Sequence, residues 1–173
     1  MNPHVAEIIG TALLVLLGNG VVANVVLQRT KGQGGGWLLI AAGWGMAVFA
    51  AVACVERFSG AHINPAVTVG LALTGEFEWA RVPGFVGAQC AGAFAGAVLV
   101  YLAYFRHFEA TDDPAAKLGT FSTGPAIQAP GWNLATEAIG TFVLVLVCLY
   151  FASATVSVNG EDEPVGLGSV GAI

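Results

Sequence analysis

The stretch Ser59-Gly60-Ala61-His62-Ile63-Asn64-Pro65-Ala66-Val67-Thr68 decides how this chain folds. It is a polar, glycine-containing break that is followed at once by Asn-Pro, and long apolar segments flank it on both sides. In a water-soluble protein these residues would form an ordinary loop that opens an ordinary helix. In a lipid bilayer, non-helical backbone is tolerated only where it is buried in protein or lines a water-filled cavity. The stretch therefore indicates a pore.

The composition of the chain is that of a membrane protein. Hydrophobic residues make up 56% of the 173 residues and charged residues 10%, whereas soluble domains carry about 25% charged residues. The six basic residues are scattered along the chain, which argues against a nucleic-acid-binding surface. The three cysteines lie far apart in apolar segments, and we expect them to be small buried residues without a redox or metal role.

Four apolar segments are long enough to cross a hydrocarbon core of about 30 Å. They cover residues 5–27, 37–55, 82–104 and 134–156. The first segment has no basic region before it and no cleavage-type ending, so we expect a retained span and not a signal peptide. Residues 159–164 are acidic and predict a loop, and the apolar residues from Val165 onward predict the start of a fifth span.

A short apolar element lies between the second and third spans. Asn64 is of a type preferred at the N-cap of a helix, and Pro65 of a type preferred at the first helical position. The apolar residues 66–74 would form a helix of roughly 14 Å, which is about half of a bilayer core. We therefore expect a half-helix, residues 65–75, whose partially positive N-terminus points at the centre of the membrane.

The residues before this half-helix have to reach the midplane as extended backbone. The carbonyls of Gly60, Ala61 and His62 would accept hydrogen bonds there, and the Asn64 amide would donate them. A positive helix end repels cations. Together these groups suit a neutral, hydrogen-bonding solute such as water or a small polyol. His62 could also act through its ring, but we favour a role for its carbonyl, with the ring buried and paired.

The beginning of the chain recurs about three spans later. Glu7-Ile8-Ile9-Gly10-Thr11 matches Glu137-Ala138-Ile139-Gly140-Thr141, at an offset of 130 residues. Because an odd number of spans reverses the direction of the second copy, the match predicts an inverted-topology repeat. We expect residues 1–108 to form the first repeat, residues 109–131 a long extracellular loop, and residues 132–173 the start of the second repeat. The same offset would place a second copy of Asn64 near position 194, beyond Ile173.

Residues 59–68 resemble the first Asn-Pro-Ala signature of the major intrinsic protein family, the aquaporins and glycerol facilitators. Glu7-Ile8-Ile9-Gly10-Thr11, Gln89-Cys90-Ala91-Gly92-Ala93 and Glu137 agree with the pattern of the same family. The resemblance implies an all-α membrane protein with an aquaporin-like inverted repeat of three transmembrane helices plus one re-entrant half-helix, the second repeat being incomplete. It also implies a homotetramer in the bilayer of a bacterial plasma membrane, with the amino terminus in the cytoplasm. The distribution of basic residues between the two faces favours the opposite orientation.

The resemblance extends to residues that would select the solute. Trp44 precedes His62 by 18 residues, and it resembles a filter tryptophan of glycerol-conducting members, where water-specific members typically carry phenylalanine or histidine. Residues 119–125, Gly-Thr-Phe-Ser-Thr-Gly-Pro, resemble a loop segment of glycerol facilitators. These features imply passive conduction of glycerol, other small neutral polyols and water, with exclusion of ions and protons. A water-selective aquaporin is the alternative.

Two carboxylates in or at the edge of spans, Glu7 and Glu137, are functional candidates because ionisable groups are rare in the membrane. The resemblance implies that they accept hydrogen bonds from the pore loops and hold the carbonyls in line. Asn19 is polar within the first span, and it is expected to form interhelical hydrogen bonds or to face a pore or a tetramer axis. The predicted pore path consists of Gly60, Ala61, His62, Asn64, Pro65, Ala66 and Trp44.

Two other classes of protein remain as alternatives. A membrane enzyme would use Glu7, His62 and Glu137, but nothing supplies a nucleophile or a metal-ligand spacing, so we predict no catalytic residue, cofactor or metal. A non-conducting membrane protein would associate with intact channel subunits. We expect the chain to be a fragment of a longer channel that conducts, whereas the fragment by itself does not.

Overall fold

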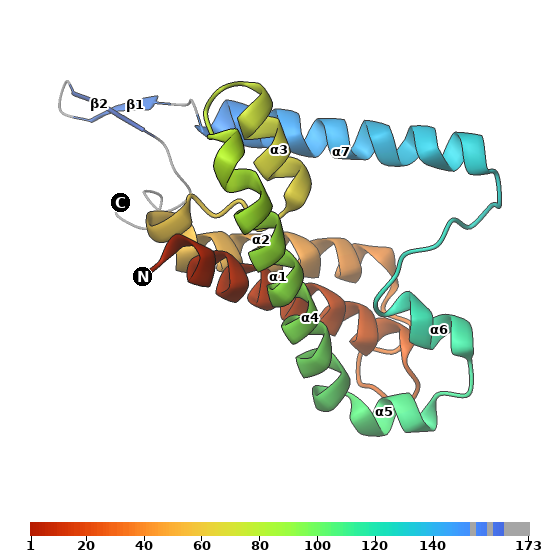
Figure 1. Ribbon diagram of the computed structural model, residues 1–173. Helices are drawn as coiled ribbons and strands as arrows, with labels where there is room; N and C mark the ends of the chain where they lie inside the picture. Colours follow the sequence, from red (N-terminus) through yellow and green to blue (C-terminus); the bar gives the residue numbers. More distant parts are fainter. Residues whose placement is uncertain (153–154, 159–160, 165–173) are drawn as a thin grey trace.

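The computed structural model describes residues 1–152, 155–158 and 161–164 (Figure 1). The elements, in chain order, are α1 (Pro3–Val26), α2 (Gly36–Ser59), α3 (Pro65–Leu73), η1 (Trp79–Arg81), α4 (Val82–Ala103), α5 (Phe105–Ala110), α6 (Pro114–Gly119), α7 (Pro130–Ala152), β1 (Thr155–Val158) and β2 (Glu161–Pro164). The two strands pair antiparallel, with Thr155 opposite Pro164. Helices account for the rest of the regular structure in the described residues.

Four helical segments are long and apolar enough to cross a membrane: Pro3–Val26, Gly36–Ser59, Trp79–Ala103 and Pro130–Tyr150. Their outer faces carry exposed large apolar side chains such as Leu38, Phe94 and Trp132. Lipid tails are as apolar as these side chains, so a membrane helix can leave them facing outward. The predicted α-helical membrane fold is confirmed, and the hairpin β1–β2 is the only part of the described residues that departs from it.

The cysteines differ from the sequence prediction. Cys54 and Cys90 are exposed, and Cys148 is half-buried. The expectation that all three are buried is therefore wrong. The physical reason is the same as for the large apolar side chains, since an apolar residue on a lipid-facing helix gains little by turning toward protein.

α1 packs against both α2 and α4, and small residues bring the backbones of α1 and α4 close together. A Cβ atom on Gly92 would lie 2.4 Å from the carbonyl oxygen of Ile8, and one on Gly96 would lie 2.6 Å from that of Ala12. Both distances are too short for any side chain. The glycines of α4 therefore fix which turn of α1 lies beside which turn of α4.

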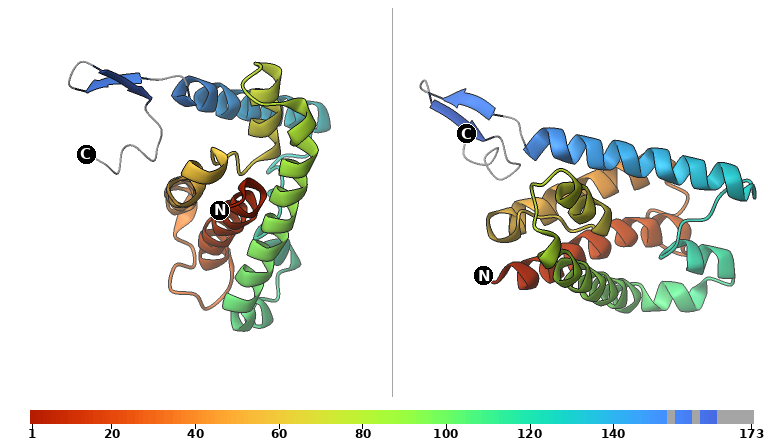
Figure 2. Two further views of the ribbon diagram at one scale, coloured as in Figure 1. Left: turned by 60° about the vertical axis from the view of Figure 1, so that its left-hand side comes forward. Right: turned by 45° about the horizontal axis from the view of Figure 1, so that its top comes forward.

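α7 runs in the direction opposite to α1, as both views of the ribbon show (Figures 1 and 2). This reversal is what an inverted repeat requires of the matching segments at Glu7 and Glu137. α7 packs against the short helix α3. The contact is close at Gly70, where a Cβ atom would lie 2.5 Å from Cγ1 of Val145.

Several element boundaries differ from the expected ones. The second span continues from Val55 to Ser59, and the fourth begins at Pro130 and ends at Ala152 instead of covering residues 134–156. Residues 155–158 and 161–164 form a β-hairpin where we expected the end of a helix and an acidic loop. The β-branched Thr and Val residues of β1 favour strand over helix. The expected start of a fifth span, at residues 165–173, lies outside the described residues.

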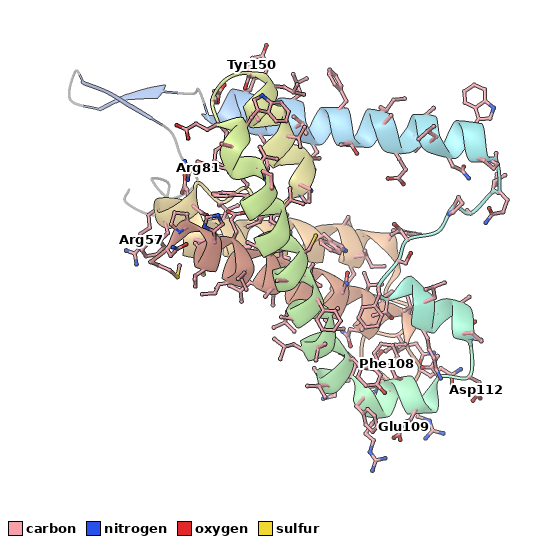
Figure 3. All side chains as sticks on the ribbon, in the orientation of Figure 1. Arg57, Arg81, Phe108, Glu109, Asp112 and Tyr150 are labelled. Atoms are coloured by element: carbon pink, nitrogen blue, oxygen red, sulfur yellow. The ribbon has the colours of Figure 1, made fainter. Side chains whose placement is uncertain are left out.

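The long loop after α4 contains two short helices that the sequence analysis did not predict. α6 begins as a regular capped helix, because Asp113 accepts a hydrogen bond from the Ala115 amide at 2.8 Å and a proline follows the cap. The loop is held against the turn that follows α1, since the Gln28 amide donates to Thr111 Oγ1 at 2.9 Å. Phe108, beside this loop in Figure 3, stacks on Phe121.

Candidate functional site

The site begins where α2 ends. Gly60 is the C-cap of α2, with a left-handed φ of 80° that suits glycine. Ala61 and Ile63 also have left-handed φ values, 49° and 45°, which are rare for residues with a side chain. The prediction that residues 60–62 continue as extended backbone is therefore wrong. The segment turns at nearly every residue, and this turning decides where its amide hydrogens point.

A single buried carboxylate receives these amide hydrogens. Glu7 on α1 has no exposed surface. Its Oε1 accepts from the hydroxyl of Ser59 at 2.6 Å and from the amide of His62 at 3.0 Å. Its Oε2 accepts from the amide of Ile63 at 2.7 Å and from Nε2 of Gln89 at 2.8 Å. Four donors on two oxygens suit an ionised carboxylate, which only accepts hydrogen bonds.

The direction of the carbonyls follows from these contacts. The peptide bonds here are trans, so each carbonyl points away from the N–H of the next residue. Because the amides of His62 and Ile63 donate to Glu7, the carbonyls of Ala61 and His62 point away from it. The amide of Ala61 donates to Ser59 Oγ at 3.1 Å, which turns the carbonyl of Gly60 away as well. None of the three carbonyls accepts a hydrogen bond from the part of the chain that the structure describes.

The half-helix opens as the sequence predicts. Asn64 is its N-cap and accepts a hydrogen bond from the Ala66 amide at 2.8 Å, and Pro65 is the first helical residue. α3 ends at Leu73, two residues earlier than expected, and its nine residues correspond to about 14 Å. In the side chain of Asn64, only the oxygen has a partner among the described residues. The side-chain NH₂ group is therefore available as a donor.

The ring of His62 is buried, and its side chain is 6% exposed. Nδ1 lies 3.1 Å from the hydroxyl oxygen of Thr68, and the ring packs against the rings of Phe77 and Phe85, with centroids 4.6 and 4.9 Å away. Arg81, labelled in Figure 3, lies over the Phe77 ring at 4.8 Å. The ring is thus buried and paired, which leaves the His62 carbonyl as the group that this residue can offer to a solute.

Trp44 lies about 22 Å along α2 from Ser59, from the rise per residue of a helix. Its ring packs on Gly18 of α1 and is half-buried. It lines a cavity of about 220 Å³ together with Asn19, Val22 and residues 119–123. A second cavity, of about 710 Å³, includes Trp44 and residues 122–125. The loop segment singled out in the sequence therefore lies beside the predicted filter residue, and Asn19 lies there too.

Glu137 is not brought together with the other predicted site residues. It is exposed on α7, and its carboxylate makes no hydrogen bond with any residue that the structure describes. Trp44 is also distant from residues 60–66, because most of α2 lies between them. The structure thus keeps Gly60, Ala61, His62, Asn64, Pro65 and Ala66 together in one continuous segment, which Glu7 binds at His62 and Ile63. Trp44 lies toward the other end of α2.

Three polar residues of the site had no assigned role in the sequence analysis. Ser59, Thr68 and Gln89 all contact Glu7, His62 or each other. The available signal was Gln89, the only amide side chain in α4, a helix that has no charged side chain. A strongly polar group in a membrane span is a functional candidate. No group of three His, Cys, Asp or Glu side chains that could hold a metal was found among the described residues.

Comparison with known proteins agrees with this geometry. The family model of the major intrinsic proteins matches residues 1–173. A "probable glycerol uptake facilitator protein" of Thermotoga maritima is 57% identical over 146 residues, which cover 84% of this chain and 62% of that protein. The glycerol uptake facilitator protein of Bacillus subtilis is 51% identical over 146 residues, covering 84% of this chain and 53% of that protein. This chain therefore spans somewhat more than half the length of these relatives.

Among solved structures, the chain is similar to the aquaglyceroporin of Plasmodium falciparum. The TM-score is 0.60 at 36% sequence identity, and the match covers 65% of this chain and 45% of that one. Over the matched part of the chain, the arrangement of helices is therefore similar to that of a solved aquaglyceroporin.

Proposed function

Because this chain belongs to the major intrinsic protein family, we propose that it contributes the first Asn-Pro-Ala half of a passive channel. The permeants are glycerol, other small neutral polyols and water, and ions and protons are excluded. The observation that carries the proposal is the set of three carbonyls at Gly60, Ala61 and His62. Hydrogen bonds to Glu7 turn the carbonyls of Ala61 and His62 away from it, and a hydrogen bond to Ser59 turns that of Gly60. None of the three has a partner among the described residues. No reaction, cofactor or metal is part of this function.

The proposed site acts by replacing hydrogen bonds that a solute makes in water. A polyol hydroxyl donates to one of the three carbonyls and accepts from the amide of Asn64. The amino end of α3 carries a partial positive charge, which disfavours cations at the same place. The carbonyls are fixed before the solute arrives, because Glu7 holds the amides of His62 and Ile63 and Ser59 holds that of Ala61.

Trp44 supports the choice of glycerol over water alone. Its ring offers an apolar wall to the carbon atoms of a polyol, and Asn19 and the loop residues 119–123 line the same cavity. The relatives named as glycerol facilitators are 51–57% identical to this chain, which also favours glycerol. A water-selective channel is the second candidate. It would conduct water at a similar rate and glycerol at the rate of a protein-free bilayer.

The chain is a multi-pass membrane protein with four membrane-length helices in its described part. We propose that residues 1–108 form the first repeat, that residues 109–131 form the extracellular loop, and that residues 132–173 begin the second repeat. The amino terminus would then be cytoplasmic. The assembly proposed is a homotetramer in the plasma membrane, as the family resemblance implies.

The test compares two proteins in liposomes. One is residues 1–173, and the other, called here the extended protein, adds the part of the Thermotoga maritima relative that follows the matched residues. Shrinking and reswelling in sucrose and glycerol gradients are followed by light scattering. We expect the extended protein to pass both water and glycerol, and residues 1–173 alone to pass neither. Water flux without glycerol flux in the extended protein would favour the water-selective candidate, and no flux of either would contradict the proposal.

A further inference from the structure

Gln89 lies in the middle of α4 and is 1% exposed. Its Nε2 donates two hydrogen bonds, one to Oε2 of Glu7 at 2.8 Å and one to Oγ1 of Thr68 at 2.9 Å. These partners belong to α1 and α3. The side-chain amide of Gln89 therefore connects α4 to α1 and α3, beside the non-helical segment between α2 and α3.

The orientation of this amide is fixed by its partners. If the nitrogen and oxygen of Gln89 were exchanged, the amide oxygen would face the carboxylate of Glu7, and two acceptors would repel each other. In the observed orientation Oε1 has no partner among the described residues, although it is buried. A buried acceptor without a partner is unfavourable. The site tolerates this because both donor hydrogens of Nε2 are in use.

Thr68 carries the contact from Gln89 into the half-helix. It has no exposed surface. Its hydroxyl donates to the Asn64 carbonyl oxygen at 3.2 Å and accepts from Gln89. Since the hydroxyl hydrogen is then used, the contact of 3.1 Å between Thr68 Oγ1 and Nδ1 of His62 requires the ring to donate. Gln89 thus reaches both ends of the segment 62–64, through Glu7 on one side and through Thr68 on the other.

The close crossing of α1 and α4 brings Gln89 to Glu7. Gly92 lies one turn beyond Gln89, and Ile8 directly follows Glu7. A Cβ atom on Gly92 would lie only 2.4 Å from the Ile8 carbonyl oxygen. The two backbones therefore come together at the turn where the carboxylate and the amide meet, and a larger residue at position 92 would separate them.

We propose that Gln89, acting with Thr68, is a positioning residue for the permeation pathway. It holds the Glu7 carboxylate in the one orientation in which both oxygens meet their backbone donors. In that orientation the amides of His62 and Ile63 are fixed and the carbonyls of Ala61 and His62 face the solute. This role rests on the proposed channel function, but it has a consequence that needs no transport. Without Gln89, the amides of His62 and Ile63 exchange their hydrogens faster.

The experiment is hydrogen exchange, measured by mass spectrometry, on residues 1–173 in lipid nanodiscs. Gln89→Leu and Thr68→Val remove the two linked groups with little change in volume. Thr68→Ser retains the hydroxyl. Thr11→Val is the matched control, because Thr11 is also a buried threonine but its hydroxyl has no partner among the described residues. If Gln89→Leu does not fold, the three threonine variants still decide the question.

The expected result is local. In Gln89→Leu, exchange in the peptide that contains His62 and Ile63 rises about tenfold or more, as the loss of a hydrogen bond to a charged group implies. In Thr68→Val it rises by less, about threefold or more, because Thr68 makes only neutral hydrogen bonds and reaches Glu7 through Gln89. In both variants, exchange in α1, α2 and α4 stays unchanged. In Thr68→Ser and Thr11→Val, exchange at His62 and Ile63 stays at the rate of the parent protein. Gln89→Leu and Thr68→Val, made in the extended protein, reduce the ratio of glycerol to water permeability.

Two results overturn the proposal. One is unchanged exchange at His62 and Ile63 in both variants. The other is a rise of the same size in α1, α2 and α4, since that would show general destabilisation instead of positioning. A separate outcome concerns the proposed function alone. If the extended protein passes no glycerol while the local exchange changes as expected, the channel proposal fails and the positioning of the segment stands.

Discussion

At the scale of single residues, Glu7 is the group on which the site depends. It accepts hydrogen bonds from two backbone amides, a hydroxyl and a side-chain amide, and it is fully buried. If one of its oxygens were replaced by an NH₂ group, that group would face the N–H or O–H donors that now bond to the oxygen. Buried donors left without acceptors are unfavourable by about 1–3 kcal/mol each.

We therefore predict that Glu7→Gln destabilises residues 1–173 by about 2–4 kcal/mol, which a thermal unfolding curve in detergent measures. Glu137→Gln is the matched control. That carboxylate is exposed on α7, so its replacement should change stability by no more than about 0.5 kcal/mol. An equal loss of stability in the two variants would show that the hydrogen bonds of Glu7 do not stabilise the segment 60–63.

The backbone of residues 60–63 gives a second prediction at this scale. Gly60 has a φ of 80°, so Gly60→Ala should destabilise the protein by about 1–2 kcal/mol. Ala61 has a left-handed φ of 49°, so Ala61→Gly should relieve strain and be neutral or slightly stabilising. Chemical or thermal unfolding of the two variants measures both effects. The opposite order of stability would argue against the left-handed turns.

Trp44 is the residue on which the proposed solute selection rests. We predict that Trp44→Phe in the extended protein lowers the ratio of glycerol to water permeability, by up to about tenfold, since small changes in an apolar wall give discrimination of that order. Light scattering with water and then glycerol gradients measures both permeabilities in one preparation. An unchanged ratio would remove Trp44 from the proposed filter.

At the scale of elements, the crossing of α1 and α4 positions the site, because Gln89 and Glu7 meet where the two backbones lie close together. We predict that Gly92→Ala destabilises the protein by about 1–3 kcal/mol, since a Cβ atom would overlap the carbonyl oxygen of Ile8. Gly87→Ala is the control on the same helix, as a Cβ there meets no atom within 4 Å. Thermal unfolding distinguishes them, and equal melting temperatures would contradict the close crossing.

Much of this element-level arrangement could be predicted from the sequence. Apolar length marks the four spans, and Asn64-Pro65 marks the start of α3, because capping depends on residues next to each other in the chain. The conformation of residues 60–63 could not be predicted. Ala61 and Ile63 have no intrinsic preference for a left-handed φ, and they adopt it because Glu7, more than fifty residues away, accepts the amide hydrogens of His62 and Ile63.

The same limit applies to the other elements. Gln89 and Thr68 meet only through the crossing of helices, which a local pattern does not reveal. The helices α5 and α6 are short and depend on contacts such as that between Gln28 and Thr111. The hairpin β1–β2 was missed because apolar, β-branched residues near the end of a span suit either a helix or a strand.

At the scale of the whole molecule, the two carboxylates of the sequence repeat lie on helices that run in opposite directions, Glu7 on α1 and Glu137 on α7 (Figures 1 and 2). Glu7 has its full set of donors, and Glu137 has none among the described residues. In an inverted repeat the second carboxylate would hold a second broken segment in the way Glu7 holds the first. Because the pore would need both broken segments, flux should be measured on the extended protein.

The most direct test of the account is the glycerol permeability of liposomes that contain the extended protein, compared with the same protein carrying Glu7→Gln at equal protein content. We predict glycerol flux well above that of protein-free liposomes, and a loss of most of this flux in the variant, because the carbonyls of Ala61 and His62 are no longer held toward the solute. Glycerol flux that is equal in the two proteins would contradict the claim that Glu7 builds the path.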